Sequence, residues 1–294
     1  MSMPLPSETT PEHAPALDKG RAAFRLVQGL AAELSAGRLS LPSLPEVVLR
    51  IQRTLADEDC EAEQIAELIA SEPTFAGAIL KLGNSVFYRR SGAETTSIVT
   101  CIARLGLPMV RSASMHFAMQ QMREAEEFRS IRHLLQPEWE SGQVCAGVCH
   151  SLARKTRRAH PDDMLTLGLV HNIGRIYLIS RGAEFGDNDA AVGMNELFDE
   201  WHPVVGSAIA ESWNLPEQAV QAIAQQTTPD AEQDFAHDIN DLLGLAVALA
   251  AVRENAEAVA AAASTPAAVR LGVNEAALAA VVEDAREFSE LLVY

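Results

Sequence analysis

Two adjacent side chains, His171 and Asn172, are the residues of this chain that most directly suggest chemistry. They lie between two apolar stretches in the run LGLVHNIGRIYL (167–178), which we predict to be one buried helix. A neutral imidazole is a common ligand of divalent metals, and an amide oxygen can also ligate, although it lacks the charge of a carboxylate. Whether the doublet belongs to a hydrolase or to a binding protein therefore depends on the residues around it.

A short basic stretch interrupts an otherwise acidic chain. It consists of Arg154, Lys155, Arg157 and Arg158. One interpretation is a solvated helix end, because cations are stabilised at the negative end of the helix dipole. The other is a site for an anion or a protein partner.

The overall charge and the cysteines exclude several classes of protein. Lys and Arg number 23 against 40 Asp and Glu, a formal net charge of −17, which argues against binding to nucleic acid. No uninterrupted apolar run is long enough to span a bilayer, so we expect no membrane segment. The four cysteines form no CxxC pair, and their usage fits a reducing cytoplasm; we expect Cys145 and Cys149, one helical turn apart, to be buried apolar residues.

The hydrophobic pattern has a helical period along nearly the whole chain, so we predict an all-α fold. Residues 1–18 are rich in proline and small polar residues and are expected to be flexible. The principal helices are expected over about 21–34, 45–55, 139–157, 162–180, 202–213, 216–226 and 237–252.

Local signals set the ends of several helices. Pro73 should begin a helix that Gly83 and Asn84 end in the left-handed conformation. Thr96 or Ser97 should cap a further helix, which Gly106 stops. The methionines at 115, 119 and 122 should fill the core.

Five segments, taken together and in this order, resemble the HDOD family. They are LPSLPEVVLRIQRTL, IAELIASEPTFAGAILKLGNSVFYRR, SIVTCIARLGLPMVR, LGLVHNIGRIYL and WHPVVGSAIAESWNLPEQAVQAI. The resemblance implies two packed helical subdomains, the second a degenerate branch of the HD-type phosphohydrolase bundle. It also implies a role in bacterial signal transduction. We assign residues 19–253 to this domain, divided into 19–136 and 137–253, and 254–294 to a helical extension that packs on it.

The same resemblance locates the places where an HD hydrolase would hold its metal with two His and two Asp. The first His is replaced by Ser141, the doublet is His171–Asn172, and the last Asp is matched by Val247. Relatives with two metals use further histidines. His202 fits one of those places, and a later His pair is replaced by Gln225 and Gln226.

One clear ligand out of four remains, so we expect neither a metal nor another cofactor. Neutral or missing ligands do not offset the cost of removing water from a dication. His171 is then a hydrogen-bonded structural histidine, and His202 a helix-start residue before Pro203. The register of the Val247 helix leaves one alternative, in which Asp241 approaches the pocket.

Three functions are compatible with these residues. The first is a non-catalytic regulatory module that binds signalling proteins on other chains. The second is an active phosphohydrolase acting on a nucleotide or a cyclic dinucleotide. The third is a binder of a small anionic ligand in the former metal pocket. A homo-oligomer is also compatible with the sequence, which does not specify the oligomeric state.

The segment Asn84–Tyr88 is a candidate contact surface, because it carries aromatics directly after a helix stop. The alternative, which we favour, is that Phe87 and Tyr88 cover the core between the two halves.

Overall fold

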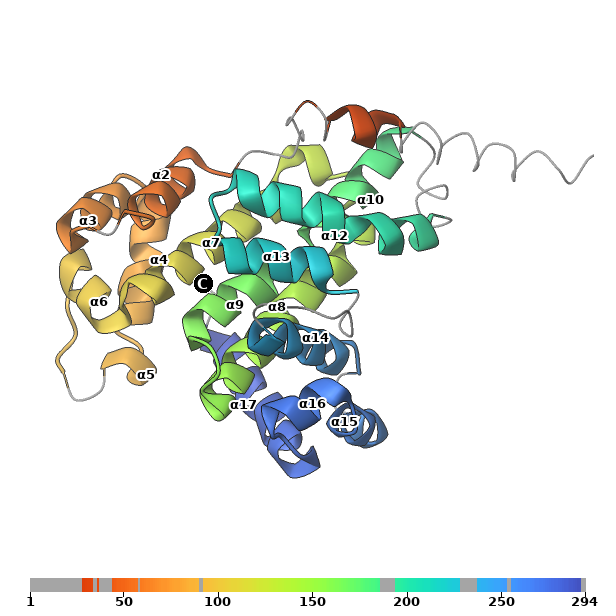
Figure 1. Cartoon of the computed structure of the whole chain (residues 1–294). Helices are drawn as coiled ribbons and strands as arrows, with labels where there is room; N and C mark the ends of the chain where they lie inside the picture. The colour runs from red at the N-terminus through yellow and green to blue at the C-terminus, as the bar shows by residue number, and fades with distance from the viewer. Residues whose placement is uncertain are drawn as a thin grey trace, which may run out of the picture.

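The computed structural model describes residues 28–33, 36, 44–57, 59–89, 92–185, 194–227, 237–252 and 255–291. All regular secondary structure in these ranges is helical, which confirms the all-α prediction (Figure 1). The segment 1–18 lies outside the described residues. Of the helix expected over 21–34, residues 28–33 are described and are helical.

The N-terminal group of helices lies on one side of the molecule (Figure 1). It contains α2 (Glu46–Thr54), α3 (Ala62–Ala70), α4 (Pro73–Gly83), α5 (Val86–Arg89) and α6 (Ile98–Leu105). Apolar residues three or four positions apart turn inward from each of the longer helices, for instance Val48 and Ile51 on α2 and Ile65 and Ile69 on α3.

The ends of these helices largely follow the local signals. Pro73 begins α4, and the hydroxyl of Ser97 accepts a hydrogen bond from the backbone N–H of Thr100 at the start of α6. Gly106 has φ of 80°, a conformation that disfavours any side chain, and it separates α6 from α7. The prediction of a left-handed end at Asn84 was wrong. Asn84 has φ of −95°, because its side chain instead pairs with the backbone of Thr95.

Helix α7 (Leu107–Glu124) connects the two groups. Eleven of its 18 residues are buried, among them the three methionines of the predicted stripe. It contacts α2, α4 and α6 on one side and α9 on the other. The buried side chains of α7 pack against the N-terminal helices on one side and against α9 on the other, so α7 belongs to the core of both groups.

The second group is a bundle built around the long helix α8, reached through the short helix η1 (Glu126–Phe128). Its helices are α8 (Arg132–Thr156), α9 (Pro161–Val170), α10 (Ile173–Phe185), α12 (Asn195–Ser212), α13 (Glu217–Gln225) and α14 (His237–Val252). Helix α8 begins before the expected Trp139 and continues through Pro137, so it crosses the predicted division at 136/137 without interruption.

Three helices follow the bundle: α15 (Ala256–Ala263), α16 (Pro266–Leu271) and α17 (Glu275–Leu291). Helix α17 packs along α8, and buries Leu278, Val281 and Phe288. The ring of Phe288 lies 5.9 Å from that of Phe87 and stacks on His150 at 3.9 Å. The aromatic segment after α4 therefore reaches α17, but Phe87 remains 44% exposed, so it covers the core between the halves only in part.

No single helix in the described ranges is long and apolar enough to cross a membrane. Helices α6 and α7 would meet the length and composition criteria together, but they are bent by 109° at Gly106.

Candidate functional site

The His171–Asn172 doublet lies at a break between two helices. Helix α9 ends at Val170 and α10 begins at Ile173, so the prediction of one continuous helix over 162–180 was wrong. Apolar residues on both sides are buried, which is why the pattern continues through the break. Both side chains of the doublet are buried at a turn, where they lie between α8 and the later helices.

A close crossing of α10 and α12 brings His202 to the doublet. A Cβ atom on Gly174 would lie 2.1 Å from the carbonyl oxygen of His202 and 2.6 Å from the backbone nitrogen of Gly206. Only glycine permits this approach. His202 is in the interior of α12, which begins at Asn195 and includes Pro203, so the expectation of a helix-start histidine was wrong.

The amide of Asn172 is bound to α8. Its Nδ2 donates to the carbonyl oxygen of Glu138 at 2.7 Å and to Glu138 Oε2 at 3.2 Å. The Glu138 carboxylate also accepts from Arg175 Nε at 2.7 Å, and Arg175 pairs with Asp199 on α12. Asn172 Oδ1 is buried and has no hydrogen-bond partner within the described part of the chain. The amide thus serves as a donor that fixes α10 to α8.

His171 is held by the backbone and by a thiol. Its Nδ1 forms a hydrogen bond with the carbonyl oxygen of Gly168 at 2.7 Å. Burial, the largest single influence, lowers the pKa of His171. Cys145, the hydrogen bond with Gly168 and the charge of Glu138 together raise it by more, so that the pKa lies above its ordinary value. The imidazole is therefore engaged on both sides.

Cys145 and Cys149 lie one turn apart on α8, with their Sγ atoms 4.0 Å apart. The hydrogen bond from Cys149 lowers the pKa of Cys145 to about 5, with burial opposing and the charge of His171 assisting. Burial and the negative charge of Cys145 raise the pKa of Cys149. Both thiols are buried as expected, and Cys145 also interacts with the doublet.

His202 is kept neutral. Burial first, and then the positive charges of His171 and Arg175, lower the pKa of His202 to about 4. Its Nδ1 is buried and has no hydrogen-bond partner among the residues described. A positive charge on His171 thus opposes the protonation of His202.

The remaining predicted metal-site positions do not all lie at the doublet. Gln226 donates from Nε2 to the carbonyl oxygen of His171 at 2.9 Å, so it does lie at the doublet. Gln225 accepts from Asn240. Val247 is half-buried on α14. Asp241, the residue of the alternative register, is buried, and its carboxylate forms two hydrogen bonds with Arg270, at 2.6 and 2.7 Å.

The face that α8 turns to the doublet differs from the one that the resemblance suggested. Ser141 is half-buried, whereas the contacts come from Glu138, Gly142 and Cys145. These three are spaced by four and three residues and share one helical face. That spacing is visible in the sequence, but it does not reveal that Glu138 and Cys145 would contact the doublet.

The residues present do not fit the metal of an HD hydrolase. No group of three or more His, Cys, Asp or Glu residues in the described ranges is arranged to hold a metal ion. Glu138 neutralises Arg175, and the Asn172 amide turns its NH₂ toward that carboxylate. A dication needs several charged or strongly donating ligands at once.

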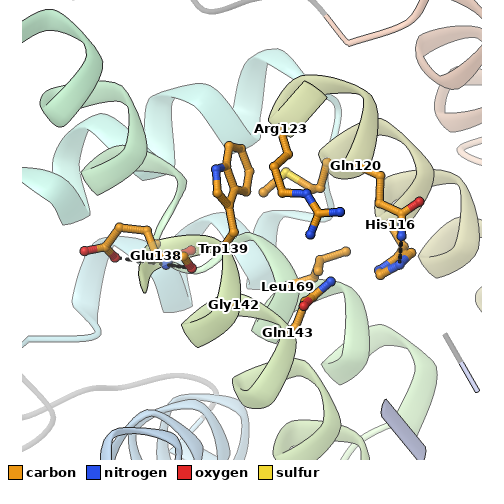
Figure 2. A pocket seen from close by; sticks show the side chains of 10 residues that line it. His116, Gln120, Arg123, Glu138, Trp139, Gly142, Gln143 and Leu169 are labelled. Carbon is orange, nitrogen blue, oxygen red and sulfur yellow. Dashed lines mark hydrogen bonds between the residues drawn. The ribbon is translucent and has the colours of Figure 1, made fainter. Parts of the chain in front are cut away.

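A narrow pocket opens beside Asn172, between α7 and α8 (Figure 2). Figure 2 shows Arg123 extending between Trp139 and the hydrogen-bonded pair His116–Gln120. The cavity measures about 10 Å³, which is about the space that one water molecule needs. A nucleotide does not fit this space.

The basic stretch lies at the C-terminal end of α8, as one interpretation predicted. All four of its side chains are exposed, and Arg157 is the left-handed C-cap with φ of 58°. Arg154 lies over the ring of Phe87 at 5.5 Å. Arg158 faces another way and pairs with Asp238 of α14 at 3.8 Å. The four residues therefore do not form a single surface.

Comparison with known proteins identifies the family of this chain. The profile of the HDOD domain matches residues 41–229, which is more than half of the chain. The chain belongs to the HDOD family. The expectation drawn from the five sequence segments is thereby confirmed.

Solved structures share the HDOD fold over most of the chain. A candidate metal-dependent phosphohydrolase from Shewanella amazonensis SB2B is 22% identical, with a TM-score of 0.72 over 92% of this chain and 99% of its own. An HDOD domain protein of unknown function from Geobacter sulfurreducens is also 22% identical, with a TM-score of 0.67 and the same coverage. These likenesses show the fold alone.

Two further relatives differ in length from this HDOD chain. A candidate signal transduction protein from Marinobacter aquaeolei VT8 is 18% identical, with a TM-score of 0.59 over 98% of this chain and 68% of its own. An uncharacterized protein from Treponema pallidum (strain Nichols) is 22% identical over 217 residues, which cover 70% of this chain and 41% of that protein. This chain thus spans about two fifths of the length of that curated relative.

Proposed function

We propose that this chain is a non-catalytic module of signal transduction that acts by binding protein partners on other chains. The observation that carries the proposal is the set of contacts around the doublet. The side chain of Asn172 donates to Glu138, His171 is held between Gly168 and Cys145, and Glu138 is neutralised by Arg175. Groups that would serve a metal in a hydrolase here hold helices together.

The HDOD family and the fold shared with a candidate signal transduction protein support the regulatory part of the proposal. Burial supports the non-catalytic part. His171 and Asn172 are both buried, and the pocket that Asn172 lines admits about one water, whereas phosphoryl transfer needs room for a phosphate and an attacking water.

A metal titration tests the non-catalytic part. A ligand at 100 times its dissociation constant raises the free energy of unfolding by about 2.7 kcal/mol. We expect Mn²⁺ at micromolar concentration to leave the melting temperature of the wild-type protein unchanged, and that of His171→Ala likewise. A rise in the wild-type protein that His171→Ala abolishes would contradict the proposal.

An activity assay tests the opposing function, a metal-dependent phosphohydrolase. The purified chain is incubated with nucleotides, cyclic dinucleotides and Mn²⁺ or Fe²⁺, beside His171→Ala as the matched control. We expect no product above the level of the variant. Turnover that depends on His171 would replace our proposal by the hydrolase.

A further inference from the structure

A second and larger cavity lies at the opposite end of α9 from the doublet. It measures about 200 Å³ and is enclosed by α7, the turn between α8 and α9, and the first turns of α9, α13 and α14. None of the predicted metal-site positions lines it.

The floor of this cavity is apolar. Met164 and Leu167 of α9 are buried there, and Ala219 of α13 and Ile239 of α14 close the sides. An aliphatic cavity of about 150 Å³ holds a benzene ring. A volume of about 200 Å³ therefore accommodates one aromatic ring together with a small substituent.

The mouth of the cavity carries positive charge. Arg111 reaches it from α7 and Arg158 from the turn after α8. Each has a carboxylate nearby, Asp163 at 3.9 Å and Asp238 at 3.8 Å, and both distances are far longer than a charge-assisted hydrogen bond of about 2.8 Å. Nη2 of Arg111 donates to the carbonyl oxygen of Leu55 at 2.9 Å, so Nη1 of Arg111 and the guanidinium of Arg158 are the groups that can bind a closer anion.

A histidine adds a donor at the same mouth. Nδ1 of His160 accepts a hydrogen bond from the backbone N–H of Asp162, as the N-cap of α9. When the ring is neutral, its Nε2 then carries the hydrogen. An acid group at the mouth would meet two guanidinium groups and this N–H, with Asp163 the one carboxylate in the lining.

We propose that this cavity binds a small aromatic acid, with the ring on Met164 and Leu167 and a carboxylate or phosphate group at Arg111 and Arg158. The site is separate from the doublet and does not depend on the proposed function. It also gives a role to Arg158, one of the four residues of the basic stretch. The closer hydrogen bonds to the acid would replace the long contacts with Asp163 and Asp238.

Phenyl phosphate is the probe that tests this site, followed by ligand-observed NMR and by calorimetry on the full chain. Inorganic phosphate supplies the acid without the ring, and benzyl alcohol supplies the ring without the charge. We expect phenyl phosphate to bind with a dissociation constant below about 1 mM and at least about tenfold more tightly than either fragment. Equal binding of inorganic phosphate, or of benzyl alcohol, would overturn the proposal.

Three variants locate the binding. Ala219→Phe should fill the cavity and abolish binding. Arg158→Gln should weaken it at least about fivefold, since it removes a charged hydrogen bond. Lys155→Gln removes an exposed charge from the same stretch outside the cavity and should change affinity by less than about twofold. Arg158 is exposed, so its variant remains informative if Ala219→Phe does not fold. Unchanged binding in Arg158→Gln, or an equal loss in Lys155→Gln, would refute the assignment.

Discussion

The two ends of α9 make opposite use of polar side chains. At its C-terminal end the doublet, Glu138 and Arg175 lie in close contact, and the adjoining cavity measures about 10 Å³. At its N-terminal end Arg111 and Arg158 form ion pairs of 3.8 Å or more around a cavity of about 200 Å³. The difference teaches that close polar contacts can fix one end of a helix while charged side chains at its other end remain loosely paired around a larger cavity.

The largest effect should come from the helix crossing that holds the closed end together. Gly174→Ala places a Cβ against the backbone of α12, with no flexible side chain to move aside. We expect a loss of about 3 kcal/mol or more in the free energy of unfolding. Urea denaturation measures it. Gly244→Ala is the control, since its Cβ would meet no atom within 4 Å, and it should be neutral or stabilising by up to about 1 kcal/mol.

The next effect concerns Glu138. Glu138→Ala leaves Arg175 and the amide of Asn172 without this partner in a largely buried place. We expect the free energy of unfolding to fall by about 2–4 kcal/mol, as measured by urea denaturation. The exposed control Glu211→Ala should lower it by less than about 0.5 kcal/mol. A double-mutant cycle with Asn172→Ala should show coupling between the two residues. Additive losses would mean that Glu138 and Asn172 do not act as a unit.

A smaller effect should appear in the pH dependence of stability. The pKa of His202 is lowered to about 4 in the folded chain, against about 6.5 for a free imidazole. The unfolded chain therefore binds more protons between these values, so the contribution of His202 is complete above pH 6.5 and is lost as the pH falls toward 4. The difference in stability between wild type and His202→Asn should narrow over this range. A difference between wild type and His202→Asn that does not depend on pH would contradict the closed site.

The smallest effect should be found at the open end. Arg158 is half-exposed and its ion pair is long, so Arg158→Gln should change stability by less than about 0.5 kcal/mol. Lys155→Gln serves as the matched control, and thermal denaturation measures both. A large loss in Arg158→Gln would show that this arginine is structural, and the contrast between the two ends would then disappear.

Much of the helical framework was predictable, because local signals determine it. The hydroxyl of Ser97, the positive φ of Gly106 and the helical spacing of Val48 and Ile51 act within a few residues. The break at the doublet was missed, since buried residues on both sides preserve the apolar pattern through it. Pro203 suggested a helix start, yet α12 accommodates it in its interior.

The surroundings of the doublet were less predictable. The family resemblance identified Asn172 and Gln226 as former metal-site positions, and Gln226 does lie beside His171. Glu138 and Cys145 could not be identified, because their contacts depend on how α8 rotates against the break between α9 and α10. The larger cavity draws its lining from five segments of the chain, and no local pattern links them.

The burial of α7 has a consequence for how the chain opens. Ser114 bonds to Gln52 of α2 on one side, and Ser112 bonds to Thr166 of α9 on the other. Separating either group of helices would uncover α7, so local opening there costs nearly as much as global unfolding. In hydrogen exchange, the amides of α7 should be among the last to acquire deuterium. The two groups of helices that flank α7 should lose protection together, as one cooperative unit.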